Sequence, residues 1–167
     1  VVVGIPHAVF AQWTDITPNE IKYTSGQTMG VTFGDVDFDG DDDLIIATGA
    51  SAGGKTMLFL NDGSGNFTNA TQGIFAEHHN VWSPLLGDSD NDGDLDLFFV
   101  AFGEQCRLYE NQGDLQFVEL SSNGIFTAAD NMMARGGSWV DYDSDGLLDI
   151  MVSTNAAKGS VGRDKLY

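Results

Sequence analysis

The sequence predicts an all-β protein built from repeated four-stranded antiparallel sheets. Three observations support this. Turn-forming clusters recur along the whole chain, short apolar runs separate them, and one acidic pattern occurs three times at a fixed spacing. The 167 residues include 21 glycines but only 3 prolines, and 42% of them are hydrophobic. This composition is typical of one folded domain with many short strands.

The repeated acidic pattern is D-x-D-x-D-G-x-x-D. It occupies residues 35–43, 88–96 and 141–149, so successive copies begin 53 residues apart. Self-similarity at a fixed period indicates a repeat architecture in which each period is one supersecondary unit. The period therefore defines three structural units.

Each unit contains short apolar runs in a constant order around its acidic segment. The first runs are 29–34, 82–87 and 136–140, the second 44–48, 97–101 and 150–154, the third 57–61, 107–111 and 165–167, and the fourth 66–70 and 116–120. Four strands that follow one another as antiparallel hairpins form the blade of a β-propeller. We therefore expect about three propeller-like blades within residues 12–167.

The third unit lacks a fourth run, but a run of that type occurs near the start of the chain. Gln12–Ile16 aligns with Gln116–Leu120, so residues 12–17 are predicted to act as the complementing fourth strand, within the chain or in a neighbouring molecule. Propellers usually close with about 4 to 8 blades. The three blades are thus expected to be completed by strand exchange or to belong to a larger propeller. Residues 1–11 form an apolar N-terminal arm, either docked on a neighbour or left from a secretory signal.

The acidic segments predict cation-binding loops. Alternate carboxylates point to one side of a tight loop, and glycine at position six permits the sharp turn, as in the calcium loop of EF-hands. Positions one, three, five and nine would supply side-chain oxygens and position seven its backbone carbonyl, which is all that a leucine there can offer. The candidate ligands are Asp35, Asp37, Asp39, Asp41 and Asp43, then Asp88, Asp90, Asp92, Asp94 and Asp96, then Asp141, Asp143, Asp145, Leu147 and Asp149. All-oxygen ligation favours Ca²⁺ over Mg²⁺, so about three structural calcium ions are expected.

The formal net charge of -18 is concentrated in these loops, which contain 15 of the 25 acidic residues. Without a cation, neighbouring carboxylates would repel by about 4 kcal/mol per close pair at an effective dielectric constant near 20. The 7 Lys and Arg residues form no basic stripe, which argues against a nucleic-acid partner. No apolar run reaches the length of about 18 residues that a membrane span needs.

Residues 49–56, GASAGGKT, match the phosphate-binding pattern G-x-x-x-x-G-K-[ST]. That pattern requires a helix directly after it, because the helix N-terminus favours the phosphate. Here the next residues are the short run Met57–Leu60 and then a cluster of turn formers, which indicates a strand. We therefore interpret residues 49–56 as part of a hairpin connection.

Other chemistry in the sequence is sparse. Asn66 and Asn69 begin N-x-[ST] triplets and are possible glycosylation sites. The single cysteine, Cys106, excludes an internal disulfide. No Ser-His-Asp, Cys-His or paired-carboxylate constellation stands apart from the acidic loops, so we expect no enzymatic activity.

The acidic loops with their flanking runs resemble FG-GAP/VCBS repeats, the calcium-bearing blades of integrin-type β-propellers, and Trp13–Thr17 resembles the F-T-D-V-T strand of that family. The resemblance implies an extracellular, secreted or cell-surface protein with structural calcium and no catalytic residues. The expected role is structural. One form of this role is a filament subunit whose partners are further copies of the chain, joined head-to-tail by strand addition. Two alternatives stay open: an adhesion module that binds a carbohydrate or protein ligand, and a non-catalytic part of a larger secreted enzyme.

Overall fold

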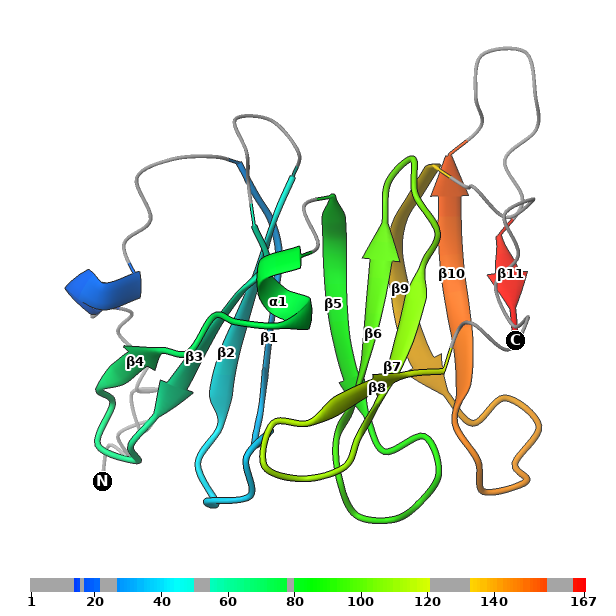
Figure 1. The fold of residues 1–167 in the computed structure, drawn as a ribbon. Helices are drawn as coiled ribbons and strands as arrows, with labels where there is room; N and C mark the ends of the chain where they lie inside the picture. The colour runs from blue at the N-terminus through cyan, green and yellow to red at the C-terminus, as the bar shows by residue number, and fades with distance from the viewer. Residues whose placement is uncertain are drawn as a thin grey trace, which may run out of the picture.

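Three antiparallel sheets make up the fold in the computed structural model (Figure 1). The structure describes residues 14–15, 17–21, 27–49, 55–77, 80–120, 133–155 and 164–167. The strand orders are β1-β2-β3-β4, β5-β6-β7-β8 and β11-β10-β9. The strands are β1 (Thr28–Gly34), β2 (Asp43–Thr48), β3 (Met57–Asn61), β4 (Phe67–Asn69), β5 (Val81–Gly87), β6 (Asp96–Ala101), β7 (Arg107–Asn111), β8 (Phe117–Glu119), β9 (Met133–Val140), β10 (Asp149–Asn155) and β11 (Lys165–Leu166). The all-β prediction is confirmed.

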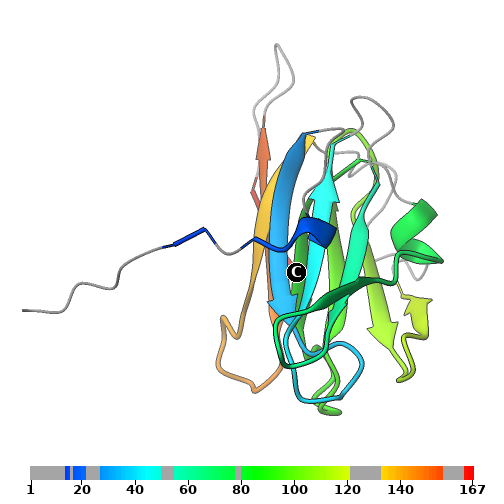
Figure 2. The same cartoon turned by 90° about the vertical axis from the view of Figure 1, so that its left-hand side faces the viewer.

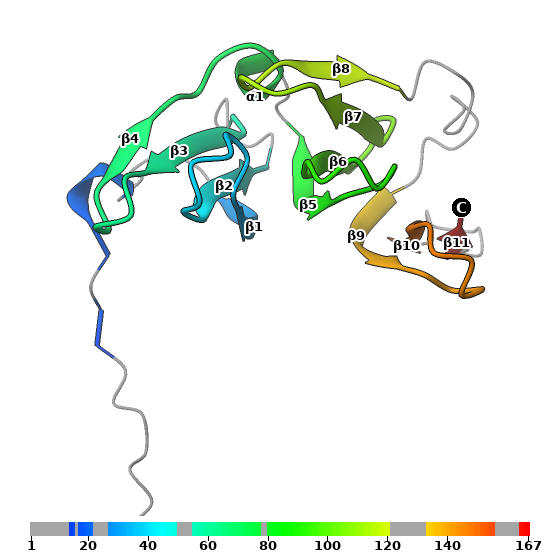
Figure 3. The same ribbon diagram turned by 90° about the horizontal axis from the view of Figure 1, so that it is seen from below.

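The three sheets stand side by side in an arc (Figure 3). Their first strands, β1, β5 and β9, lie on the inside of the arc, and β4 and β8 lie on the outside. The acidic segments connect the first and second strands of each sheet, and all three are at the same end of the sheets (Figure 2). The arrangement is propeller-like, with blades that do not close into a ring.

The central strands of the first two sheets are buried along their whole length. Every residue of β2 and of β6 is inaccessible, because each strand has hydrogen-bonded neighbours on both edges and packing on both faces. This explains why their sequences are continuous apolar runs rather than alternating ones. Strand β10 alternates between buried and accessible residues, since only its face toward the second sheet is covered.

Two apolar layers between the sheets hold the arc together. Between the first and second sheets, Ile45 and Leu58 pack in one cluster with Leu97, Phe99 and Tyr109. Between the second and third sheets, a second cluster contains the following buried residues: Phe98, Val100, Cys106, Leu108, Ala134, Ile150 and Val152. Each sheet therefore contributes one apolar face to the next, as stacked repeats do.

Glycines on the inner strands allow the sheets to approach closely. A Cβ atom built at Gly34 would lie 2.8 Å from Leu86 Cδ1, and one at Gly87 would lie 2.7 Å from Trp139 Cδ1. These two contacts are related by the 53-residue repeat. A large side chain of one sheet thus fills the space left by a glycine of the preceding sheet.

Replacing Gly87 with alanine should therefore lower the free energy of unfolding by about 1–3 kcal/mol, because the new methyl group would overpack the contact with the Trp139 indole. Urea denaturation measures the loss. Gly136→Ala is the matched control on β9, since its Cβ would meet only Ser153 Oγ at an ordinary 3.5 Å. Equal losses in the two variants would contradict this packing account.

Two features differ from the sequence-based expectations. The short helix α1 (Ile74–Glu77) was not expected; it buries Phe75, whose ring packs edge-on against Phe99 and Phe117. The expected fourth strand at 12–17 is not formed at its described residues 14, 15 and 17, which belong to no strand. The chain continues into a 3-10 turn, η1 (Asn19–Ile21), where Ile21 packs against the outer face of the first sheet. The described residues 14, 15 and 17 pair with no strand of the third sheet.

Residues 1–11 lie outside the described part of the chain. The connection expected at 49–56 precedes strand β3 rather than a helix, so the hairpin interpretation of that segment is confirmed at its C-terminal end. Among the described helices, none has the length and apolar character needed to cross a membrane.

Candidate metal centres

The three acidic loops have the same backbone shape. Each follows the last residue of a first strand, and the register pairs Gly34 with Asp43, Gly87 with Asp96 and Val140 with Asp149. The sixth residue has a positive φ in each loop: 93° at Gly40, 100° at Gly93 and 90° at Gly146. That conformation favours glycine, which explains the invariant position within the three copies.

The loops are stabilised by their own carboxylates. The amide of the sixth residue donates to Oδ2 of the first aspartate, at 2.9 Å in the first loop, 3.1 Å in the second and 3.2 Å in the third. The amide of the seventh residue donates to Oδ1 of the fifth, from Asp41, Asp94 and Leu147 respectively. The first and fifth side chains therefore fold back into the turn.

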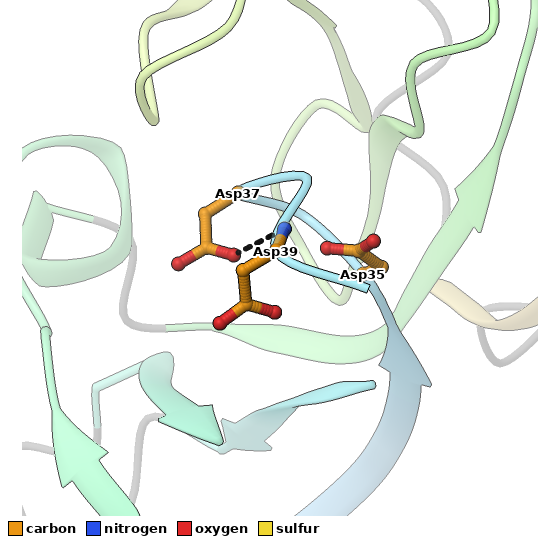
Figure 4. A group of neighbouring side chains, drawn as sticks. All are labelled: Asp35, Asp37 and Asp39. Atoms are coloured by element: carbon orange, nitrogen blue, oxygen red, sulfur yellow. Dashed lines mark hydrogen bonds between the residues drawn. The ribbon is translucent and has the colours of Figure 1, made fainter. Parts of the chain in front are cut away.

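Within each loop, the structure brings three carboxylates together. In the first two loops, ligand atoms from positions one, three and five lie within 4.8 Å of one another: Asp35, Asp37 and Asp39, then Asp88, Asp90 and Asp92. Figure 4 shows the first group around its turn, with the Asp39 amide donating to Asp37 Oδ1 at 3.3 Å. In the third loop the group is Asp141, Asp143 and Asp149, and it does not include Asp145.

Position nine has a second task beyond the one expected from the sequence. Asp43 is fully buried, and its two oxygens accept hydrogen bonds from the amides of Val36 and Asn61 at 3.1 and 2.9 Å. Asp96 is also buried and accepts from the amides of Ser89 and Asn111, both at 3.0 Å. These aspartates tie the loop to the third strand of the sheet. Asp149 is more accessible and accepts from the Tyr142 amide at 2.8 Å.

Position seven presents different side chains in the three loops. The Asp41 carboxylate lies against Gly63 in the β3–β4 turn, and the Leu147 side chain is half exposed. Neither observation places the side chain among the three grouped carboxylates of its loop. A ligand role at this position would therefore use the backbone carbonyl, as the sequence pattern suggests.

Clustering raises the proton affinity of several of these groups. Desolvation raises the pKa of Asp37, and repulsion from Asp39 adds to it. Desolvation raises the pKa of Asp43 to about 6 against the hydrogen bonds from Asn61 and Val36. The pKa values of Asp90 and Asp94 are raised by desolvation and by the charge of Asp92. Among the described residues, the one ion pair joins Arg107 and Glu119. No described ion pair therefore neutralises the negative charge of the loops.

The residues fit a hard divalent cation. Three carboxylates whose ligand atoms lie within 4.8 Å of one another offer only oxygen donors, and Asp35 Oδ1 is buried without a hydrogen-bond partner among the described atoms. A buried carboxylate oxygen without a donor is costly unless a cation contacts it. Oxygen ligands in a flexible loop suit Ca²⁺, whereas Mg²⁺ demands stricter geometry and keeps more waters.

Two residues that sequence reasoning did not single out support the loops. Asn61 and Asn111 end the third strands of the first and second sheets, and their amides hold the ninth aspartates. Their side chains donate to the carbonyls of Asp42 and Leu95, just before those aspartates. The signal was present in the sequence, because an asparagine ends the third run in both units.

The two possible glycosylation residues lie around strand β4. Asn66 is exposed in the β3–β4 turn, where its Nδ2 donates to Asp62 Oδ2 at 2.8 Å. Asn69 is exposed at the end of β4, and its Oδ1 accepts from the Thr71 amide at 2.9 Å. Both side chains are accessible, and their modification stays a prediction.

Comparison with known proteins identifies the repeats. The sequence pattern described as "FG-GAP-like repeat" matches residues 39–99 and 90–152, which together span more than half of the chain. The two matches overlap at the second acidic loop and include the connection between successive sheets. A search of curated proteins gave no match.

Proposed function

The chain belongs to the FG-GAP-like repeat family, and from this membership we propose that it is an extracellular repeat module whose blades are stabilised by calcium. Repeats of this family are typical of extracellular and adhesion-type proteins and are typically non-catalytic. The observation that carries the proposal is a group of three carboxylates at one end of each of the three sheets, from positions one, three and five in two loops and one, three and nine in the third. We propose a structural role, without enzymatic activity.

In this role each loop holds one calcium ion. The first, third and fifth aspartates of the first two loops would hold it, and Asp141, Asp143 and Asp149 would do so in the third, with Asp145 close by in the same turn. Calcium supplies the positive charge that lets these carboxylates remain ionised at close range. Extracellular calcium modules bind with dissociation constants of roughly 10⁻⁴–10⁻³ M, which suits an ion that is always present outside the cell.

Thermal unfolding of the whole chain tests the proposal. Calcium should raise the melting temperature strongly over metal-free protein, because an ion that binds only the folded state stabilises it by mass action. Magnesium at the same concentration is the control and should raise it much less. A melting temperature that does not respond to calcium would overturn the proposal.

The pH dependence should change sign with calcium. Asp43, Asp37, Asp90 and Asp94 have pKa values raised above the ordinary 3.8, so the metal-free folded state binds protons more tightly than the unfolded state does. Metal-free protein should therefore become more stable as the pH falls from about 7 to about 5, the range around the Asp43 pKa. Calcium-loaded protein should become less stable, because protons displace the ion. Urea denaturation at both pH values measures the slopes, and slopes of equal sign would contradict this expectation.

We further propose that copies of this chain assemble by strand addition at the third sheet. Residues 12–17 of one molecule would pair beside β11, which has no second neighbour among the described strands. The outer face of that sheet also exposes Val140, Met151 and Leu166. Met151 and Leu166 are the repeat equivalents of Phe98 and Leu108, which are buried by the next sheet. Head-to-tail addition that does not close would give a filament.

Sedimentation velocity with calcium and with excess chelator tests the assembly. We expect large species with calcium, and smaller ones for a variant that lacks residues 1–17. The shortened variant should keep its calcium-dependent melting, which separates assembly from folding. A full chain that stays monomeric at high concentration with calcium would overturn the assembly proposal and leave the calcium proposal standing.

A second candidate role, ligand binding, has one observation in its favour. The rings of Trp82 and Phe102 stack at 4.6 Å, and the exposed Arg135 guanidinium lies 4.6 Å from the Trp82 ring centre. No ion pair of Arg135 occurs among the described residues. Stacked arginine presents in-plane donors suited to a carboxylate. Binding of acidic and neutral oligosaccharides to the chain and to Arg135→Ala tests this role, and equal binding to both proteins would argue against it.

A further inference from the structure

Two asparagine side chains connect neighbouring acidic loops. Asn91, at position four of the second loop, donates from Nδ2 to the Gly146 carbonyl of the third loop at 2.8 Å. Asn111, at the end of β7, donates to the Val36 carbonyl of the first loop at 3.1 Å while its own amide holds Asp96 of the second loop. Hydrogen bonds of one asparagine residue therefore connect each pair of neighbouring loops: those of Asn91 connect the second and third loops, and those of Asn111 connect the first and second.

The connection through Asn91 joins peptide groups that are themselves held by loop carboxylates. The Asp92 amide, next to Asn91, donates to Asp88 Oδ1 at 3.1 Å and to Asp90 Oδ1 at 3.2 Å. Across the contact, the Leu147 amide in the Gly146–Leu147 peptide donates to Asp145 Oδ1 at 2.8 Å. A shift of the carboxylates in the second loop can thus reach the third loop through the Asn91–Asp92 peptide, the Asn91 side chain and the Gly146–Leu147 peptide.

The connection through Asn111 is buried. Asn111 is 1% exposed and Val36 is 0% exposed, and the Val36 amide donates to Asp43, the ninth residue of the first loop. Asn61 is the repeat equivalent of Asn111, and among the described strands no sheet precedes the first one, so the side-chain hydrogen bond of Asn61 that the structure describes, to the Asp42 carbonyl, stays within its own sheet. The asparagine that ends the third strand therefore connects two loops only where another described sheet packs in front of its own.

In the structure each loop is a closed turn that groups three carboxylates. A bound cation would favour this closed turn, because it offsets the repulsion between the carboxylates. The Gly146 and Val36 carbonyls accept the asparagine hydrogen bonds in this closed conformation. A closed loop therefore favours closure of its neighbour, and the effect acts equally in both directions.

We propose that calcium binding at neighbouring loops is positively coupled, through Asn91 between the second and third loops and through Asn111 between the first and second. The inference rests on the proposed calcium sites and adds that they are not independent. A single exposed hydrogen bond corresponds to a change in affinity of roughly threefold. We expect this size for Asn91, and a larger one for the buried Asn111.

The test follows each loop separately in the intact chain. Gly40, Gly93 and Gly146 donate to the first aspartates of their loops, so their amide resonances in ¹⁵N-glycine-labelled protein should report calcium binding loop by loop. The variant is Asn91→Ser, because serine already occupies the equivalent position 144 with a φ of 62°, against 61° at Asn91, and is too short to reach Gly146. Ser144→Asn is the matched control, since no described loop follows the third.

We expect the calcium midpoints of Gly93 and Gly146 to rise about threefold in Asn91→Ser, and those of Ser144→Asn to match the unaltered chain. Disabling the third loop with Asp143→Asn should weaken the second loop in the chain with Asn91, but not in the chain with Ser at position 91. A Gly93 midpoint that is unchanged both in Asn91→Ser and in Asp143→Asn would overturn the coupling alone. Resonances that do not respond to calcium in the unaltered chain would overturn the calcium proposal itself.

Discussion

Replacing Asn111 with alanine should lower the free energy of unfolding by about 2–4 kcal/mol, because the buried carbonyl of Val36 and the partly buried carbonyl of Leu95 both lose their donor. Asn111 is also one of the largest fully buried side chains, so its removal leaves a cavity. Urea denaturation in the presence of calcium measures this loss. We expect it to be among the largest for any polar residue of the described chain.

Asn61→Ala is the matched control for this prediction. Asn61 has the same position in the first sheet, but it is partly accessible and its side chain donates only to Asp42. Its loss should cost about 1 kcal/mol or less, as for an ordinary hydrogen bond. Similar losses in Asn61→Ala and Asn111→Ala would show that the contact between sheets contributes little, contrary to our account.

Neutralising two carboxylates of the middle loop should have opposite effects with and without calcium. In the double variant Asp88→Asn and Asp90→Asn, the metal-free protein should be more stable than the unaltered chain, because two like charges in one cluster are removed. With calcium the same variant should be less stable, since the second loop loses two of its three grouped negative charges, and a neutral amide oxygen binds calcium more weakly than a carboxylate. Melting temperatures in calcium and in metal-free buffer measure both effects.

Asp94→Asn is the control in the same loop. It removes a charge of the same sign but keeps the backbone carbonyl that position seven would use, and Asp94 is not one of the three grouped carboxylates. We expect it to retain the calcium response. If the double variant kept that response as well, Asp88 and Asp90 would not be calcium ligands.

Much of the fold could be predicted from the sequence, because the same strand and loop pattern occurs in three copies that can be compared with one another. The 53-residue period locates the loops, and the position-six glycines agree with the positive φ values there. Strands β2 and β6 were recognisable because a fully buried strand has a continuous apolar run, here Leu44–Ala47 and Leu97–Ala101. Most of the expected strands differ from the observed ones by only one or two residues at their ends.

The remaining features depend on contacts between sheets, which one repeat does not encode. Helix α1 forms where Phe75 reaches the rings of Phe99 and Phe117, so its stability comes from packing rather than from its own four residues. The bridging role of Asn111 likewise requires the first sheet beside the second. Residues 12–17 matched a strand pattern, yet strand pairing needs a sheet edge within reach. In this chain the segment instead leads to Ile21 on the first sheet.

The ninth aspartates show a similar limit of pattern reading. The pattern predicts Asp43 and Asp96 as ligands like the others, which stays a prediction, and the structure adds that both are buried and that their oxygens anchor the loop. Asp149, on the more accessible third sheet, joins the group of three. The same residue type at one position of the repeat is thus buried in two copies and partly accessible in the third, which sequence alone does not reveal.

Calcium stoichiometry tests the central claim most directly. Equilibrium dialysis of the full chain against calcium, followed by elemental analysis of both compartments, should find three ions per chain, one for each group of carboxylates. The variant with Asp88→Asn and Asp90→Asn should hold one ion fewer. A chain that holds no calcium above the buffer level, or a variant that holds as much as the unaltered chain, would contradict the assignment of these loops as calcium sites.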